Sequence, residues 1–325
     1  MDIAERARKS VVFLGGKDSY SGAFVPLGTG FLAVKRCQEI QFQHVITARH
    51  VLDMIAGDDV WIRINKSEGG SEIISAPKKS WFVASGDTYI DVAMCPLMLT
   101  QHYFDIVHID LDNDLYDGSQ MRPLEVGDEV FATGLFTSHQ GEAHNIPICR
   151  FGNIAATADE PVLTEYGDMH GILVEVKSLG GLSGSPVFVR FHAPGYLGGV
   201  PAKTCLIGLM HGHFLVENPE DAISPSGKDR ATGQINTGIG LVVPADYILD
   251  LVNNPDRESE RMAAVERIRK RSKVHADAAV TRLTRAALPA SEPGAAPPAT
   301  DGNPTHREDF DDLVGKAAKR RTEDQ

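Results

Sequence analysis

Short apolar segments broken by glycine, proline and asparagine fill most of the chain up to residue 252. Their lengths and their content of β-branched and aromatic residues favour strands, and few stretches carry apolar residues at the spacing of a long helix. Many short strands joined by turns predict an all-β sandwich or barrel. The expected strands are Ser10–Leu14, Thr29–Val34, His44–Thr47, Val60–Ile64, Val92–Leu97, Glu129–Thr133, Ile148–Ile154, Ile172–Val176, Pro186–Val189, Cys205–Met210 and Gly238–Val243.

The pattern changes at residues 253–255, where turn residues end the succession of short segments. An imperfect apolar stripe predicts a helix over 256–288, which Pro289 ends. The stretch 289–304 is rich in proline, alanine and glycine and indicates a flexible linker. Residues 305–321 have capping-box spacing and one apolar face, which favours a short amphipathic helix that docks on a protein partner or on the chain's own body. The alternative is a frayed end that is amphipathic by chance.

Charge and composition narrow the class of protein. The 325 residues carry a net charge of −12, which argues against nucleic acid or an anionic membrane as the main partner. The tail after residue 255 holds 14 basic and 13 acidic side chains, which leaves 18 and 31 for the body. No apolar run has the length of a membrane-spanning helix, and the charged opening is unlike a signal peptide. Four scattered cysteines fit a reduced compartment, so a cytoplasmic location is expected.

Three separated segments each carry one member of a nucleophilic triad. His50 follows the apolar strand 45–47, where an imidazole can act as general base. Asp91 stands at the mouth of another apolar strand, where a carboxylate can fix the tautomer of that histidine. Ser183 lies in the sequence GGLSGSPV, whose glycines permit the tight turn that exposes a serine nucleophile. Taken singly, each residue has an ordinary structural explanation.

The glycines around Ser183 also suit the stabilisation of an oxyanion. They allow the backbone N–H groups of Gly181 and Ser183 to point into one small space, which a tetrahedral intermediate requires. Each such donor is typically worth about two to three powers of ten in rate.

Together these segments resemble the trypsin-like serine proteases, above all the disulfide-free bacterial branch that includes the Deg and HtrA proteases. The order His50, Asp91, Ser183 is that of the family, and TARHV, DVAM and GLSGSPV stand where the family has its three triad motifs. GTGFLA, VGDEVFATG, LIGLMHG and TGIGLVVPADYI follow in the expected sequence. The resemblance implies one peptidase domain over 1–255, built from two six-stranded antiparallel β-barrels, at about 10–105 and 120–252. It implies no metal or organic cofactor.

Three positions depart from the family pattern. Leu182 stands where zymogen-activated members have an aspartate, so activation through a new N-terminus is not expected. Val51 replaces the disulfide cysteine of secreted relatives, which favours a protein without disulfides. Ser185 replaces a glycine and is an alternative nucleophile, although Ser183 has the family spacing from Gly181.

Substrate preference depends on a pocket that the sequence outlines weakly. Lys177 lies six residues before Ser183, where trypsin-like relatives often have the pocket floor, and His211 and His213 lie on the segment expected to form its wall. If all three face inward, the pocket is electropositive and favours an acidic or amide side chain before the cleaved bond. The alternative is a solvated lysine.

The predicted function is therefore that of a serine endopeptidase, which hydrolyses polypeptides through an acyl-enzyme on Ser183. Two alternatives remain open at this stage. A protease fold can be kept as a catalytically inactive binding or regulatory module, and a protease can act mainly on its own tail.

Overall fold

The computed structural model describes residues 3–86, 89–157, 160–176, 180–191, 203–217 and 234–287. The chain divides into two compact units, residues 1–269 and 270–325. The linker predicted over 289–304 and the docking helix predicted over 305–321 lie outside the described residues.

The first half of the body is an eight-stranded sheet that follows the short helix α1 (Ile3–Ser10). Seven strands lie in the order β5-β4-β1-β2-β3-β7-β6, and β8 pairs in parallel with β2. Glycines and polar turns separate the strands, as the sequence pattern predicts. The strands are β1 (Val11–Lys17), β2 (Phe24–Cys37), β3 (Ile40–Thr47), β4 (Asp59–Asn65), β5 (Ser71–Pro77), β6 (Phe82–Val83), β7 (Ala93–Pro96) and β8 (Ile109–Asp110).

This sheet is not closed within the described part of the chain, so the first of the two expected barrels is not shown. Its edge strands, β5 and β6, do not pair with each other. β6 has only two residues, and so short a strand offers few ladder hydrogen bonds with which to close a sheet.

The second half is a closed barrel of six antiparallel strands in the order β10-β13-β16-β15-β14-β9. Its interior is filled by buried aliphatic side chains, among them Val130, Val174 and Val187. A two-stranded hairpin, β11 (Val162–Thr164) and β12 (Gly167–Met169), interrupts the barrel sequence between β10 and β13. The barrel strands are β9 (Glu129–Gly134), β10 (Ile148–Ala156), β13 (Ile172–Glu175), β14 (Pro186–Phe191), β15 (Lys203–Glu217) and β16 (Gln234–Pro244). The protein is thus mostly β, with one barrel where the resemblance to trypsin-like proteases implies the second.

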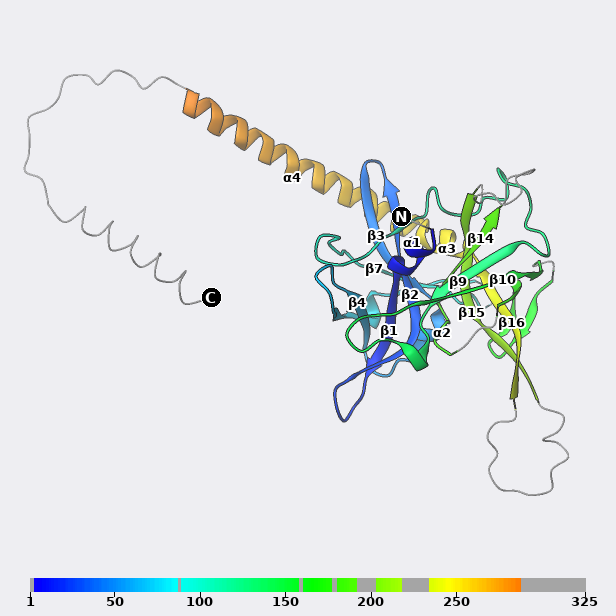
Figure 1. Cartoon of the computed structure of the whole chain (residues 1–325). Coiled ribbons are helices and arrows are strands. Elements are labelled where there is room, and N and C mark those ends of the chain that lie inside the picture. The colour runs from blue at the N-terminus through cyan, green and yellow to red at the C-terminus, as the bar shows by residue number, and fades with distance from the viewer. Residues whose placement is uncertain are drawn as a thin grey trace, which may run out of the picture. The chain divides into compact units, whose positions relative to one another are not determined.

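Sheet and barrel lie side by side (Figure 1). They share one apolar core. The cluster that contains Phe31 and Ile46 of the sheet continues into Phe131 and Phe188 of the barrel, whose rings stack at 5.1 Å. Burial of this continuous surface stabilises the two halves against each other. This shared core fixes the position of the sheet relative to the barrel, and therefore the walls of any cleft between them.

Helices complete the body. The short α2 (Arg49–Met54) follows β3, and α3 (Ala245–Val252) follows β16 and contacts β15 and β16. α4 (Pro255–Ala287) occupies the segment for which a helix was predicted. Two short 3₁₀ turns lie at Lys78–Ser80 and Thr137–His139. Of the described helices, none is both long enough and apolar enough to span a membrane.

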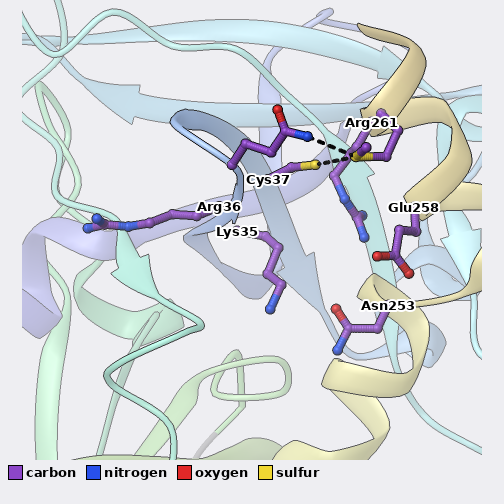
Figure 2. Close-up of a pocket in the computed structure, with 8 residues that line it drawn as sticks. Lys35, Arg36, Cys37, Asn253, Glu258 and Arg261 are labelled. Carbon is purple, nitrogen blue, oxygen red and sulfur yellow. Dashed lines mark hydrogen bonds between the residues drawn. The ribbon is translucent and has the colours of Figure 1, made fainter. Parts of the chain in front are cut away.

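The first turns of α4 pack against the hairpin formed by β2 and β3. Cys37 Sγ lies 3.4 Å from Met262 Sδ, and a cavity of about 530 Å³ remains beside this contact (Figure 2). The basic side chains that line this cavity already have partners. Arg261 donates to the Val252 carbonyl at 2.7 Å, Lys35 pairs with Asp112 and Arg36 pairs with Asp110. None of the predicted site residues lines this cavity.

His44 gives the fold a measurable pH dependence. It is buried in β3, and burial, together with the nearby Arg261 guanidinium, lowers its pKa from 6.5 to about 4. The unfolded chain therefore binds a proton between these values that the folded chain excludes, so stability falls as the pH drops. We expect the free energy of unfolding to decrease by about 2 kcal/mol between pH 7.5 and pH 5 through this group.

Urea unfolding of the wild type and His44→Gln at both pH values measures this contribution. The glutamine variant should lose less stability than the wild type over this interval by about that amount. Equal losses in the two proteins would contradict the assignment to His44.

Candidate active site

A cleft of about 730 Å³ lies between the sheet and the barrel. His50 from α2 lines it on one side, and Gly181, Ser183 and His211 from the barrel line it on the other. The structure therefore brings two of the predicted triad members and the predicted oxyanion loop to one cavity, with Asp91 buried directly behind His50.

His50 is placed by the end of β3. The strand stops at Thr47, and the imidazole stands in the first turn of α2 rather than on the strand itself. Two contacts fix its position, both to Asp91. The His50 backbone N–H donates to Oδ1 at 2.9 Å, and Nδ1 lies 2.7 Å from Oδ2. Backbone and ring are thus held by the same carboxylate.

Asp91 precedes β7 and has no exposed surface. Burial raises the pKa of this carboxyl, but hydrogen bonds from His211 and His50 outweigh burial and hold the pKa well below the usual 3.8. The carboxylate is therefore ionised under ordinary conditions. An ionised acceptor at Nδ1 leaves the proton on that nitrogen, so Nε2 of a neutral His50 is free to accept another.

Ser183 lies on a turn that only glycines allow. Gly181 and Gly184 have φ values of +97° and +83°, in the region that side chains with a Cβ rarely adopt. The turn is tied to neighbouring strands: the Thr29 N–H donates to the Ser183 carbonyl at 2.9 Å, and the Gly184 N–H donates to the Met210 carbonyl at 2.7 Å. Within the described residues, neither the Gly181 N–H nor the Ser183 N–H donates to a protein acceptor.

The hydroxyl of Ser183 forms no hydrogen bond with His50 in this structure. It donates instead to the backbone carbonyl of His211 at 2.9 Å, and no hydrogen bond among the described residues joins Ser183 to the imidazole of His50. Catalytic contacts are often absent from ligand-free sites and form only with substrate.

Two of the departures from the family pattern have clear structural consequences. Leu182 is fully buried in the barrel core, where an aspartate would be an unpaired charge. Ser185 also has no exposed surface, and its hydroxyl lies against Gly134, where an added Cβ would come within 1.9 Å. A serine without access to the cleft does not meet a molecule bound there, so the structure disfavours Ser185 as the alternative nucleophile.

His211 occupies a position that the sequence did not reveal. The sequence predicts it on a pocket wall with His213, and both do line the cleft. The His211 ring, however, also turns to Asp91, with Nδ1 2.5 Å from Oδ2. The cause is a β-bulge: the pairing of β15 with β16 shifts between Met210 and Gly212, and a bulge redirects the side chain of its extra residue.

Of the other two residues predicted to line the substrate pocket, the structure describes His213 but not Lys177. His213 is half-buried, and burial lowers its pKa. A neutral His213 contributes less positive charge than the predicted electropositive pocket requires. Lys177 lies outside the described residues, so the predicted floor of that pocket stays a prediction.

Aromatic rings cover His50 from the hairpin side. Tyr166, between β11 and β12, stacks on the His50 ring at 5.6 Å between centroids and on Tyr89 at 5.1 Å. Tyr166 lies in a polar segment without helical or strand spacing, so the sequence carries no signal for it. Tyr89 stands two residues before Asp91, so its position in the sequence could have indicated a place near the site.

The His50, Asp91 and His211 atoms are of types that also bind zinc, and they lie within 4.8 Å of one another. Zinc ligands in tetrahedral sites at about 2.0–2.1 Å from the metal lie roughly 3.3 Å apart. The separations of 2.7 and 2.5 Å found here are those of hydrogen bonds. A metal ion would have to spread the three side chains.

The solved structures that are similar to this chain include two proteases. The MamO protease domain from Magnetospirillum magneticum, in its apo form, has 20% identity and a TM-score of 0.45, covering 76% of this chain and 98% of that one. The Rv3671c protease from M. tuberculosis, in its active form, has 16% identity and a TM-score of 0.41, covering 77% and 82%. The chain is similar in structure to protease domains. No family model and no curated protein matches it. At this distance the similarity says nothing about activity.

Proposed function

We propose that the chain is a serine endopeptidase. Ser183 Oγ attacks the carbonyl carbon of a peptide bond while its proton passes to His50 Nε2. His50 returns that proton to the leaving amine, and water then releases the acyl group from Ser183 by the same route. Asp91 orients His50 and stabilises its cationic form. The N–H groups of Gly181 and Ser183 are the donors available to the oxyanion.

The double contact between Asp91 and His50 carries this proposal. A structural histidine needs one partner, but here one buried carboxylate holds both the backbone and the ring of a residue that lines the cleft. This arrangement fixes Nδ1 as the protonated nitrogen. It leaves the other nitrogen for proton transfer, which is the requirement of a general base.

An extended polypeptide fits the edge of β15. β14 pairs with Lys203–Leu209 only, whereas β16 pairs with β15 as far as Glu217. Residues 213–217 therefore have one backbone edge that no described strand occupies. A peptide bound there as an additional strand would bring its scissile bond along the edge toward Ser183.

Substrate binding also explains how Ser183 becomes reactive. The His211 carbonyl that now accepts the Ser183 hydroxyl lies at the start of this free edge. A main-chain N–H of the substrate that takes over this carbonyl releases the hydroxyl, which then turns to His50. The ligand-free contact is in this proposal a resting position of the nucleophile.

The same contact favours the second candidate function, a binding or regulatory module without catalysis. If the Ser183 hydroxyl stays on the His211 carbonyl in the presence of peptide, His50 has no nucleophile to activate. The two functions differ in whether Ser183 reacts.

Covalent labelling with a fluorophosphonate probe separates them. We expect the native chain to be labelled at Ser183, located by peptide mass mapping, and a folded Ser183→Ala variant to be unlabelled. Ser185→Ala is the matched control, because Ser185 is buried and should leave labelling unchanged. Unlabelled native protein, or equal labelling of Ser183→Ala, would refute the proposal of a serine peptidase.

Two further proposals concern the cellular location of the protein and the relation of its sheet to the first barrel of trypsin-like proteases. We propose a cytoplasmic location, which four free cysteines support. We also propose that the eight-stranded sheet is the counterpart of the first barrel of trypsin-like proteases, opened between β5 and β6.

A further inference from the structure

The Asp91 carboxylate has a partner at every acceptor position. Oδ1 accepts the His50 backbone N–H at 2.9 Å and the Tyr89 hydroxyl at 3.4 Å. Oδ2 lies 2.7 Å from His50 Nδ1 and 2.5 Å from His211 Nδ1. A carboxylate offers about four lone-pair positions, so this group is fully satisfied although it is buried.

The two contacts to Oδ2 require a proton on each imidazole nitrogen, because an ionised carboxylate has none to donate. Both rings are therefore held in the same tautomer. They meet edge to face, with centroids 5.1 Å apart, so each approaches Oδ2 from its own direction. His211 competes with His50 for the negative charge of one oxygen.

Other polar and charged groups face this cluster from each neighbouring segment. Tyr89 donates to Asp91, Tyr166 covers both imidazoles, and Ser183 donates to the His211 backbone. The remaining groups are Arg49 and Asp53 on α2, Glu165 before Tyr166, and His213 on β15. Among the described residues, none of these groups forms a hydrogen bond with Oδ2, which His50 and His211 share.

We propose that His211 is a positioning residue that shares Asp91 Oδ2 with His50 and so limits how strongly Asp91 holds a proton on His50. This inference rests on the proposed peptidase function. A carboxylate oxygen that also accepts a hydrogen bond from a second N–H stabilises an imidazolium less than an unshared oxygen does. Loss of the His211 donor would therefore leave Asp91 with more negative charge for stabilising a cationic His50.

Two substitutions at position 211 test this role. His211→Leu keeps bulk but removes the donor, and His211→Gln keeps an N–H donor that does not titrate. We expect the acid limb of the pH profile of kcat/KM to move upward by about one pH unit in His211→Leu, the equivalent of one hydrogen bond. The limb should stay near the wild-type position in His211→Gln. His102→Gln, an exposed histidine, is the matched control.

The proposal would be overturned if the acid limb of the kcat/KM profile of His211→Leu lay at the wild-type pH. It would also be overturned if the acid limb of His211→Gln moved upward as far as that of His211→Leu. A merely structural role of His211 would lower the amount of folded protein in both variants without moving the limb.

Proton NMR tests the sharing without catalysis. We expect two Nδ1 proton resonances far downfield of the amide region in the wild type, both lost in Asp91→Asn and one lost in His211→Gln. A single downfield resonance in the wild type would overturn the shared oxygen. Because this count needs no turnover, it tests the shared oxygen even if the fluorophosphonate experiment shows that Ser183 does not react.

Discussion

Replacement of Asp91 by asparagine is expected to lower kcat for peptide hydrolysis by about ten-thousandfold while the protein stays folded. The buried carboxylate accepts hydrogen bonds from Nδ1–H of His50 and of His211 through one oxygen, Oδ2. An asparagine places either a neutral oxygen or an amide group there. An amide N–H at this place makes Nδ1 of His50 a hydrogen-bond acceptor, so the ring proton moves to Nε2. A protonated Nε2 cannot receive the proton of Ser183. The rate of fluorophosphonate labelling should fall with kcat.

Asp53→Asn is the matched control for this prediction. Asp53 is an exposed acid on α2, three residues from His50, so its replacement removes the same charge near the cleft without a contact to the imidazole. We expect its kcat to stay within about threefold of the wild type, as a screened surface charge allows. If the two variants were equally active, Asp91 would not orient the base.

Replacement of Gly184 by alanine is expected to destabilise the fold by about 2–5 kcal/mol, from the left-handed backbone and the overpacking together. The residue has a φ of +83°, and a Cβ there would lie 2.1 Å from the Thr29 carbonyl oxygen and 2.4 Å from Thr47 Oγ1. Relief of these contacts moves the turn that carries Ser183. Urea unfolding should show the loss of stability, and labelling of the folded fraction should slow.

Gly57→Ala separates the two causes. Gly57 has a φ of +80°, almost that of Gly184, but nothing lies within 4 Å of an added Cβ. This variant should lose only about 1–2 kcal/mol and keep its labelling rate. A Gly184→Ala protein no less stable than Gly57→Ala would show that the turn has room that the structure does not indicate.

Much of the barrel could be predicted from the sequence, because its strands are buried on one face and bounded by glycines. The expected strand Glu129–Thr133 lies within β9, and the expected strand Gly238–Val243 lies within β16. The meeting of His50 with Asp91 was also predicted, since both stand at strand ends that a trypsin-like fold brings together. Helix α1 was not predicted, because a segment of eight residues with three basic side chains is too short and too polar to stand out as a helix in the sequence.

What the sequence did not reveal depends on long-range pairing. Whether β5 and β6 close a sheet is decided by strands that no local pattern connects. The contact of His211 with Asp91 depends on the bulge in β15, and a bulge breaks the alternation on which sequence reasoning relies. Tyr166 reaches His50 through a hairpin whose position over the cleft is likewise a tertiary property.

The helices at the two ends of the body each reach the opposite half of the molecule. α1 precedes the sheet yet contacts β9 and β10 of the barrel, and α4 follows the barrel yet places Arg257 over the ring of Phe82 in the sheet, 3.7 Å from its centroid. The two terminal helices thus each contact the half of the body that lies farther along the chain from them, and so connect the sheet with the barrel. We therefore expect a substitution beneath either helix to change the separation of Ser183 and His50, although neither helix contributes a residue to the cleft.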